Sequence, residues 1–153
     1  MSEAEGEKRA ISHSLSIERG DILLTSSAHA ARYIAKKVDI VYLIPERYST
    51  LTFVGELIRI RPASDIDPFH LLAILGYPSV REDIQSCVRG QTAHLNPNDV
   101  LDVTVPYDLR TPTQEMADLA GLLRQEARIS FDLNEIASKS PKLIRSTDAA
   151  NIN

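Results

Sequence analysis

The chain has 153 residues and a hydrophobic content of 43%, so it can bury one sizeable core and need not hold more than one domain. No apolar run is long enough to cross a bilayer, and the charged start has no signal-peptide core. The single cysteine, Cys87, excludes an internal disulfide framework and a cysteine-rich zinc site. We therefore expect a soluble, cytoplasmic protein. The net charge of -4 gives no global attraction to nucleic acid, so such binding requires a local basic patch.

Three strands are predicted in the first half of the chain, at residues 21–25, 38–44 and 51–60. The first follows a turn at Arg19-Gly20, and the other two are β-branched runs that stop at Pro45 and Pro62. An Ala-rich, basic excursion separates the first strand from the second, and a last strand is predicted at 102–105. We expect a small mixed sheet with packed helices, which is an α+β fold.

Two short helices are predicted between the third strand and the last one. Asp67 is placed to cap the first and Pro68 to occupy its first position, and Gly76-Tyr77-Pro78 ends it before a second helix at 79–88. Residues 96–99, Asn-Pro-Asn-Asp, form a turn or a single helical turn. The polar segments 1–10 and 139–153 have no apolar periodicity and are predicted to be flexible tails around a globular domain at 11–111.

A long helix is predicted at 112–138. Its apolar residues fall in alternating steps of three and four, which makes a coiled-coil seam interrupted once by Glu126. About three heptads are marginal for a free coiled coil, so this seam requires a partner helix. An equally weighted alternative is an amphipathic helix that packs on its own domain, because Leu123 widens the apolar stripe. The seam consists of Leu119, Leu122, Ile129, Leu133 and Ile136, with Glu126 between the second and third.

The sequence offers no catalytic constellation. The four histidines have no spacing that places two on one helical face, and His70, inside an apolar helix, is best read as a half-buried structural residue. No Gly-rich phosphate loop or nucleophile elbow is present. Residues 96–99 superficially resemble the tetrad with which adenine methyltransferases hold a flipped base, but they lack the second proline and the aromatic platform. We expect no catalytic residue and no metal site.

An ordered set of segments resembles one half of a type I restriction-modification specificity subunit, over about residues 17 to 137. The same module occurs at the C-terminus of some adenine DNA methyltransferases. The segments are Arg19-Gly20-Asp21-Ile22-Leu23-Leu24-Thr25, Ile58-Arg59-Ile60-Arg61-Pro62, Asp67-Pro68-Phe69-His70-Leu71-Leu72, Ile84 to Arg89, Gly90-Gln91-Thr92, His94-Leu95-Asn96-Pro97-Asn98-Asp99-Val100, Val103-Thr104-Val105-Pro106, and the helix headed by Gln114.

The resemblance implies a target-recognition domain followed by a conserved spacer helix. The expected partners are double-stranded DNA, a DNA methyltransferase subunit, and a second half-subunit or second copy that pairs through the helix. No cofactor is expected in this chain, since S-adenosylmethionine and ATP would be used by partner subunits. The family's domain starts well before the Gly-Asp strand, so we expect a domain that lacks its usual start. Alternatives are the recognition part of an adenine methyltransferase, and an interaction module that has lost DNA binding.

Phosphate contacts would position such a module, and a few polar side chains would read base edges in the major groove. Arginine suits guanine and glutamine suits adenine, because each makes two hydrogen bonds to its base. An equally weighted alternative for the Gly90 loop is a structural turn. For Arg59 and Arg61, which alternate with isoleucines, a solvated sheet face is favoured over a binding site. The DNA-contacting candidates are Arg32, Lys36 and Lys37 after the first strand, and Arg89, Gln91, Thr92 and His94 before the last strand.

Overall fold

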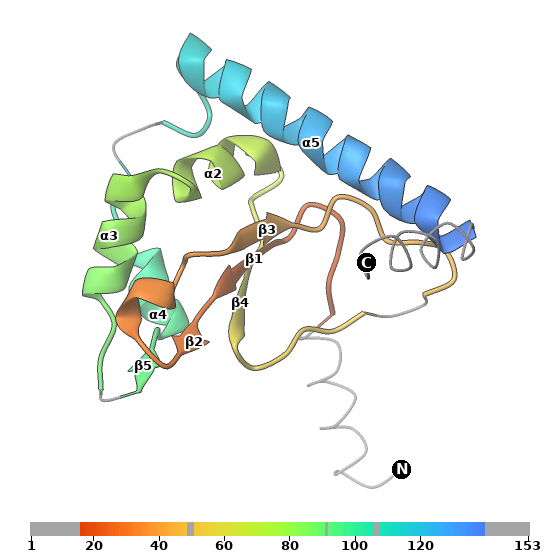
Figure 1. The fold of residues 1–153 in the computed structure, drawn as a ribbon. Helices are drawn as coiled ribbons and strands as arrows, with labels where there is room; N and C mark the ends of the chain where they lie inside the picture. The colour runs from red at the N-terminus through yellow and green to blue at the C-terminus, as the bar shows by residue number, and fades with distance from the viewer. Residues whose placement is uncertain (1–15, 49–50, 91, 106–107, 140–153) are drawn as a thin grey trace, which may run out of the picture.

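The computed structural model describes residues 16–48, 51–90, 92–105 and 108–139, and these form an α+β fold with a long C-terminal helix (Figure 1). The elements in chain order are β1 (Ile22–Thr25), β2 (Ser27–Ala28), the short 3-10 helix η1 (Ala31–Tyr33), β3 (Val38–Ile40), β4 (Leu57–Ile60), α2 (Pro68–Leu75), α3 (Pro78–Ser86), β5 (Ala93–His94), α4 (Pro97–Leu101) and α5 (Gln114–Lys139). The expected fold class is confirmed.

The central sheet has three strands in the order β3-β1-β4, and β1 pairs antiparallel with both neighbours. Ile22 lies opposite Ile40 and Ile60, and Leu24 lies opposite Val38 and Ile58. Because cross-strand partners share a face, these apolar side chains form one face of the sheet. A separate two-stranded sheet joins β2 to β5, also antiparallel. We expected a mixed sheet, and every described strand pair is antiparallel instead.

Two of the predicted strands are shorter than expected. The second ends at Ile40 rather than residue 44, because its partner strand turns away at Gly20, whose φ is +90°. The third begins only at Leu57, because a turn closed by the Leu57 N–H and the Val54 carbonyl precedes it. Within 51–56, Thr52 makes an isolated bridge with Ser16.

The predicted strand at 102–105 was wrong. The Val103 N–H donates to the Val100 carbonyl, so the chain turns at the end of α4. Val103 and Val105 still pack against the core, but no described strand pairs with this segment. The alternation of apolar residues there reflects burial of alternate side chains without a neighbouring strand.

Helix α2 begins at the predicted residue, whereas α3 runs from Pro78 to Ser86 instead of the predicted 79–88. The Asp67 carboxylate accepts a hydrogen bond from the Phe69 N–H at 2.9 Å, and Pro68 occupies the first helical position of α2. The Asn96 side chain caps α4 in the same way through the Asn98 N–H. His70 is half-buried on α2, as expected. Four consecutive residues of α2, Leu72 to Leu75, are buried, so this helix is the centre of the core.

Helix α5 packs along α2 on one side of the sheet (Figure 1). At its start, the Met116 N–H donates a hydrogen bond to the Thr113 hydroxyl at 3.3 Å. Met116 and Ala120 are the buried residues of this helix. Further along, the Tyr42 ring makes edge contacts with Phe69 of α2 and with Phe131 of α5, at centroid distances of 6.2 and 6.4 Å. Helix α5 therefore shares the core of the domain through this face.

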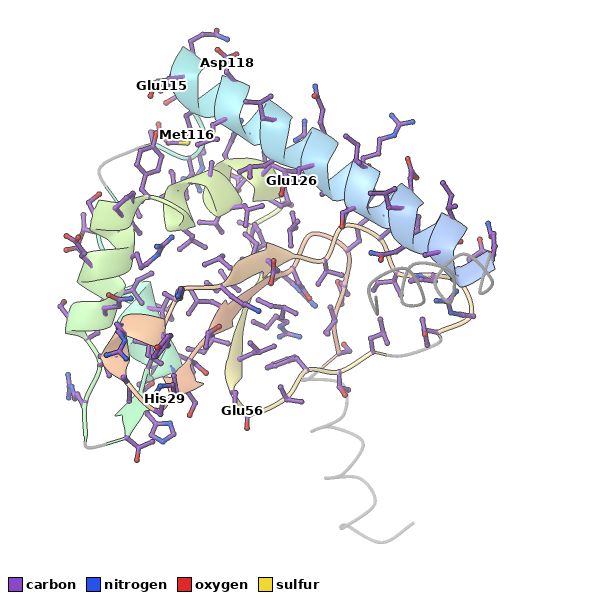
Figure 2. All side chains as sticks on the ribbon, in the orientation of Figure 1. His29, Glu56, Glu115, Met116, Asp118 and Glu126 are labelled. Atoms are coloured by element: carbon purple, nitrogen blue, oxygen red, sulfur yellow. The ribbon has the colours of Figure 1, made fainter. Side chains whose placement is uncertain are left out.

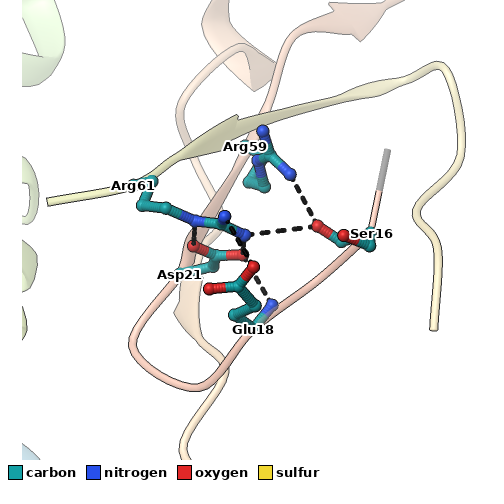
Figure 3. Close-up of polar contacts among 5 residues, drawn as sticks. All are labelled: Ser16, Glu18, Asp21, Arg59 and Arg61. Atoms are coloured by element: carbon teal, nitrogen blue, oxygen red, sulfur yellow. Dashed lines mark hydrogen bonds and ion pairs between the residues drawn. The ribbon is translucent and has the colours of Figure 1, made fainter. Parts of the chain in front are cut away.

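A buried ion pair holds the turn before β1 against β4 (Figure 3). Asp21 is only 1% exposed, and its carboxylate accepts hydrogen bonds from Nε and Nη2 of Arg61 at 2.7 and 2.8 Å and from the Glu18 N–H at 2.7 Å. Arg59 donates to the Ser16 carbonyl at 2.6 Å. The alternation places Arg59 and Arg61 on one strand face, as predicted, but that face is an interaction network rather than a solvated surface.

The described residues contain no helix that is long and apolar enough to span a membrane. The predicted tails at 1–10 and 139–153 lie outside the described residues, except that Lys139 is the last residue of α5. The predicted helix at 112–138 matches α5 to within two residues at each end.

Candidate nucleic-acid interface

The short β2–β5 sheet joins two segments that are far apart in the sequence. Ser27 pairs with His94 and Ala28 with Ala93, and the Leu95 N–H donates to the Ser26 carbonyl at 2.9 Å. A side-chain hydrogen bond links the Ser27 hydroxyl to Nδ1 of His94 at 3.0 Å. The basic excursion after β1 and the Gly90 loop, both predicted to contact DNA, are thereby brought to one end of the molecule (Figure 1).

The Gly90 loop is a tight turn closed on its own backbone. The Arg89 N–H donates to the His94 carbonyl at 3.4 Å, and Gly90 has φ of +89°, a conformation that favours glycine. The Arg89 side chain is 84% exposed, with its guanidinium 3.9 Å from the Asp99 carboxylate, and Thr92 and His94 are also exposed. Gln91 lies outside the described residues. The turn is structural, and it also presents polar side chains to solvent.

The loop from His29 to Lys37 is held firmly by the rest of the domain. Ile34 and Ala35 are fully buried, and Ala35 has a positive φ of 53°. From α3, Nε2 of Gln85 donates to the Ile34 carbonyl at 2.8 Å and to the Arg32 carbonyl at 3.3 Å. These anchors fix the backbone of η1, while the cationic side chains on either side of the buried residues, Arg32, Lys36 and Lys37, are exposed.

Two further residues belong to this surface and were missed from the sequence. The Tyr33 ring is surrounded by the Arg32 guanidinium at 4.7 Å, the Lys36 ammonium at 5.3 Å and the His29 ring at 4.6 Å. Nη2 of Arg32 also donates to the Tyr33 hydroxyl at 3.2 Å. A 3-10 turn brings residues i and i+3 to the same side, so the Tyr33–Lys36 spacing was the available signal.

The cations of this loop differ electrostatically from several other arginines of the domain. Arg61, Arg110 and Arg124 each form an ion pair with a carboxylate within 3 Å. Within the described ranges, no carboxylate forms an ion pair with Arg32, Lys36 or Lys37. An exposed cluster of unneutralised cations has a local positive potential although the whole chain is acidic. We name the exposed side chains of both loops the basic end; they are His29, Arg32, Lys36, Lys37, Arg89, Thr92 and His94.

No protein-family model matches this chain, and neither does any curated protein sequence.

Among the described residues, no group of three histidine, cysteine, aspartate or glutamate side chains is placed to hold a metal ion. An open groove of about 840 Å³ lies between β3, α2 and α5, and Lys36 of the basic end is among the residues that line it. Apart from Lys36, no residue of the basic end lines this groove.

The predicted seam of α5 divides between two faces of the helix. Leu119 is half-buried against the core, together with Leu123 and Ala127. Leu122, Ile129, Leu133 and Ile136 are 59% to 62% exposed. The exposed Glu126, labelled in Figure 2, falls between the first two in the sequence. The structure confirms that the helix packs on its own domain; four of the seam residues are exposed, and the partner helix stays a prediction. We call these four exposed residues the outer stripe.

Proposed function

We propose that this chain recognises a DNA sequence as a specificity subunit, or half of one, of a type I restriction-modification system. The observation that carries the proposal is the β2–β5 pairing, which unites two polar, carboxylate-free segments 65 residues apart into one exposed end. The segment order described in the sequence supports the same function. In this proposal the chain is not an enzyme, and methyl transfer and ATP-driven cleavage take place in partner subunits.

The two kinds of side chain at the basic end suit two kinds of DNA contact. Lys36 and Lys37 carry compact charges on flexible stems, which suits phosphate oxygens. Arg32, Thr92 and His94 carry directional hydrogen-bonding groups, which suits base edges in the major groove. The first group provides affinity for any duplex, and the second provides discrimination among sequences.

The outer stripe is the surface that we propose binds a second partner. Four large apolar side chains in heptad steps are more than the isolated exposed residues that are normal on a protein surface. Their spacing fits a facing helix, because residues at these steps form one edge of the cylinder. We propose that this helix belongs to a second copy, a second half-subunit or a methyltransferase subunit, which would place two recognition ends on one DNA.

The DNA contact is tested by fluorescence anisotropy of the full chain with a labelled duplex over a range of salt concentrations. We expect affinity to fall steeply between low and physiological salt, because binding releases counterions. Lys36→Gln and Lys37→Gln should each lower the slope of log affinity against log salt by about one. Arg128→Gln on α5 is the control and should leave the slope unchanged, because this exposed cation lies on another element and pairs with Asp132.

No affinity for duplex DNA at low salt, alone or with a methyltransferase subunit, would refute DNA recognition by this chain. An equal effect of Arg128→Gln and the lysine variants would show that binding depends on overall charge and not on the basic end. Binding of S-adenosylmethionine by the isolated chain in calorimetry would instead favour the alternative, a methyltransferase fragment.

Assembly through the outer stripe is tested by sedimentation of the double variant Leu122→Asp and Ile129→Asp. It should abolish pairing and leave the melting temperature of the domain unchanged, because both side chains are exposed. Arg128→Asp, at a side chain that is 74% exposed and about 100° around the helix from Ile129, is the control. Unchanged assembly in the double variant would mean that partners dock elsewhere.

A further inference from the structure

Within the proposed DNA interface, Arg32 differs from the other cations in how it is held. Its backbone carbonyl accepts a hydrogen bond from Gln85, and its guanidinium both lies over the Tyr33 ring at 4.7 Å and donates to the Tyr33 hydroxyl at 3.2 Å. Arg89, the other arginine of the basic end, has no ring contact in the described structure and is 84% exposed. Arg32 is therefore the preorganised arginine of this surface.

A fixed guanidinium retains most of its hydrogen-bonding capacity. Of its five N–H donors, one is used by the Tyr33 hydroxyl, and the remaining donors, including Nε–H, have no described partner. Two adjacent N–H groups match O6 and N7 of guanine, and this match requires a defined plane and direction. A phosphate contact has no such requirement, since any nearby cation satisfies it.

The Tyr33 ring is in turn held by its own contacts. The His29 ring lies 4.6 Å away at 41°, and the Lys36 ammonium lies 5.3 Å from its centroid. With three side chains around it, the ring is engaged within the protein and is not a free platform on which a DNA base can stack. Its contacts with Arg32 give it the role of orienting that side chain.

We propose that Arg32 is the specificity-determining residue of this module, reading a guanine, and that Tyr33 is the positioning residue that sets its direction. This inference rests on the proposed function. It separates the cations of the loop after β1 into one base reader, Arg32, and two phosphate contacts, Lys36 and Lys37. The loss of Tyr33 should consequently reduce discrimination between sequences and leave affinity for non-target DNA almost unchanged.

The experiment begins with selection of a randomised duplex pool by the full wild-type chain, which defines the preferred sequence. Affinity is then measured for that duplex and for duplexes with each guanine replaced by adenine. Arg32→Lys keeps the charge and loses the two-donor edge, so it should lose discrimination at one base pair by about tenfold with an unchanged salt slope. Tyr33→Phe and Tyr33→Leu should lose discrimination at the same base pair, Tyr33→Leu by about fivefold.

Two matched measurements separate positioning from folding. Thermal melting of each variant reports whether the domain is intact, and Tyr33→Phe, which keeps the ring, decides the matter if Tyr33→Leu does not fold. The double variant Arg32→Lys with Tyr33→Phe should lose no more discrimination than Arg32→Lys alone, because both changes remove one interaction.

Three results would overturn the inference while DNA binding itself persists. One is a wild-type chain that binds duplexes but enriches no guanine-containing sequence. The second is an Arg32→Gln variant that weakens all duplexes equally and lowers the salt slope, together with an Arg32→Lys variant that keeps wild-type discrimination, which is the behaviour of a phosphate contact. The third is a folded Tyr33→Phe and Tyr33→Leu pair with wild-type discrimination. Absence of any duplex binding by the wild-type chain is the separate result that refutes the proposed function.

Discussion

Replacing Asp21 by asparagine should destabilise the domain far more than its small change in size implies. The carboxylate is 1% exposed and is held by two hydrogen bonds from Arg61 and one from the Glu18 N–H. Breaking a buried ion pair by removing one charge costs about 3–5 kcal/mol. The Arg61 side chain is 39% exposed and can regain water, which favours the lower end, about 3 kcal/mol. The melting temperature should fall by roughly 10 °C.

A matched exposed pair makes the comparison decisive. Arg110 donates to Asp65 at 2.6 Å, with side chains 62% and 55% exposed, so Asp65→Asn removes the same kind of bond from the surface. We expect this control to shift the melting temperature little, because exposed ion pairs contribute little to stability. Both variants are measured by circular dichroism on heating. If Asp21→Asn loses no more stability than Asp65→Asn, the reasoning from burial is wrong.

The same carboxylate predicts a pH dependence. Burial by itself raises the pKa of Asp21, but the hydrogen bonds from Arg61 and from the Glu18 N–H outweigh it, so the folded-state pKa lies below the usual value. Its stabilising effect is therefore present above the unfolded-state pKa of about 4 and is lost as the pH falls through the folded-state pKa. Melting curves between neutral and acidic pH should show a smaller acid-induced loss for Asp21→Asn than for the wild-type chain.

Three further substitutions test the supports of the fold. Asp67→Ala removes both the cap of α2 and the ion pair with Arg124, and it should cost at least about 1 kcal/mol of unfolding free energy measured in urea. Burial raises the pKa of Asp67, but the hydrogen bond from Arg124 outweighs burial and brings the pKa below its usual range. The cost of the substitution should therefore shrink at acidic pH, where the wild-type carboxylate becomes protonated. Gly20→Ala should cost about 1–2 kcal/mol, because φ is +90° and the added Cβ would lie 3.2 Å from Pro68; wild-type stability would refute that strain. Met116→Ala should cost about 3 kcal/mol by leaving a cavity under α5, and a negligible loss would mean that α5 is held elsewhere.

The parts of the fold that depend on residues close together in the sequence were predictable. Asp67 and Asn96 cap their helices because a side-chain oxygen and an N–H two residues later are always within reach in that local geometry. The lengths of the strands were less predictable, since a strand ends where its partner ends. Gly20 ends the pairing of β1 with β3, and the Val54–Leu57 turn delays the start of β4. The apolar patterns of the segments predicted as strands do not show either limit.

In the candidate site, too, the residue types were predictable from the sequence and the contacts between distant segments were not. The cations of the excursion and the Gly90 turn could be named from residue type, but their meeting depends on two strands of two residues each, β2 and β5. Strands so short have no periodicity to detect. The pattern of α5 was ambiguous for a different reason: Leu122 and Leu123 are adjacent in sequence, yet one is exposed and the other packs on the core.

The β2–β5 pairing also has a consequence for local stability. Two paired residues per strand and a few backbone hydrogen bonds, against the longer three-stranded sheet, make this joint a low-stability unit of the domain. Its opening would separate the two halves of the basic end and expose Ala93 and Leu95, which are buried in the core. A ligand that spans both loops stabilises the joint, so the order of this region and its affinity for that ligand rise together. Amide hydrogen exchange at Ala93 and Leu95 would read this coupling directly.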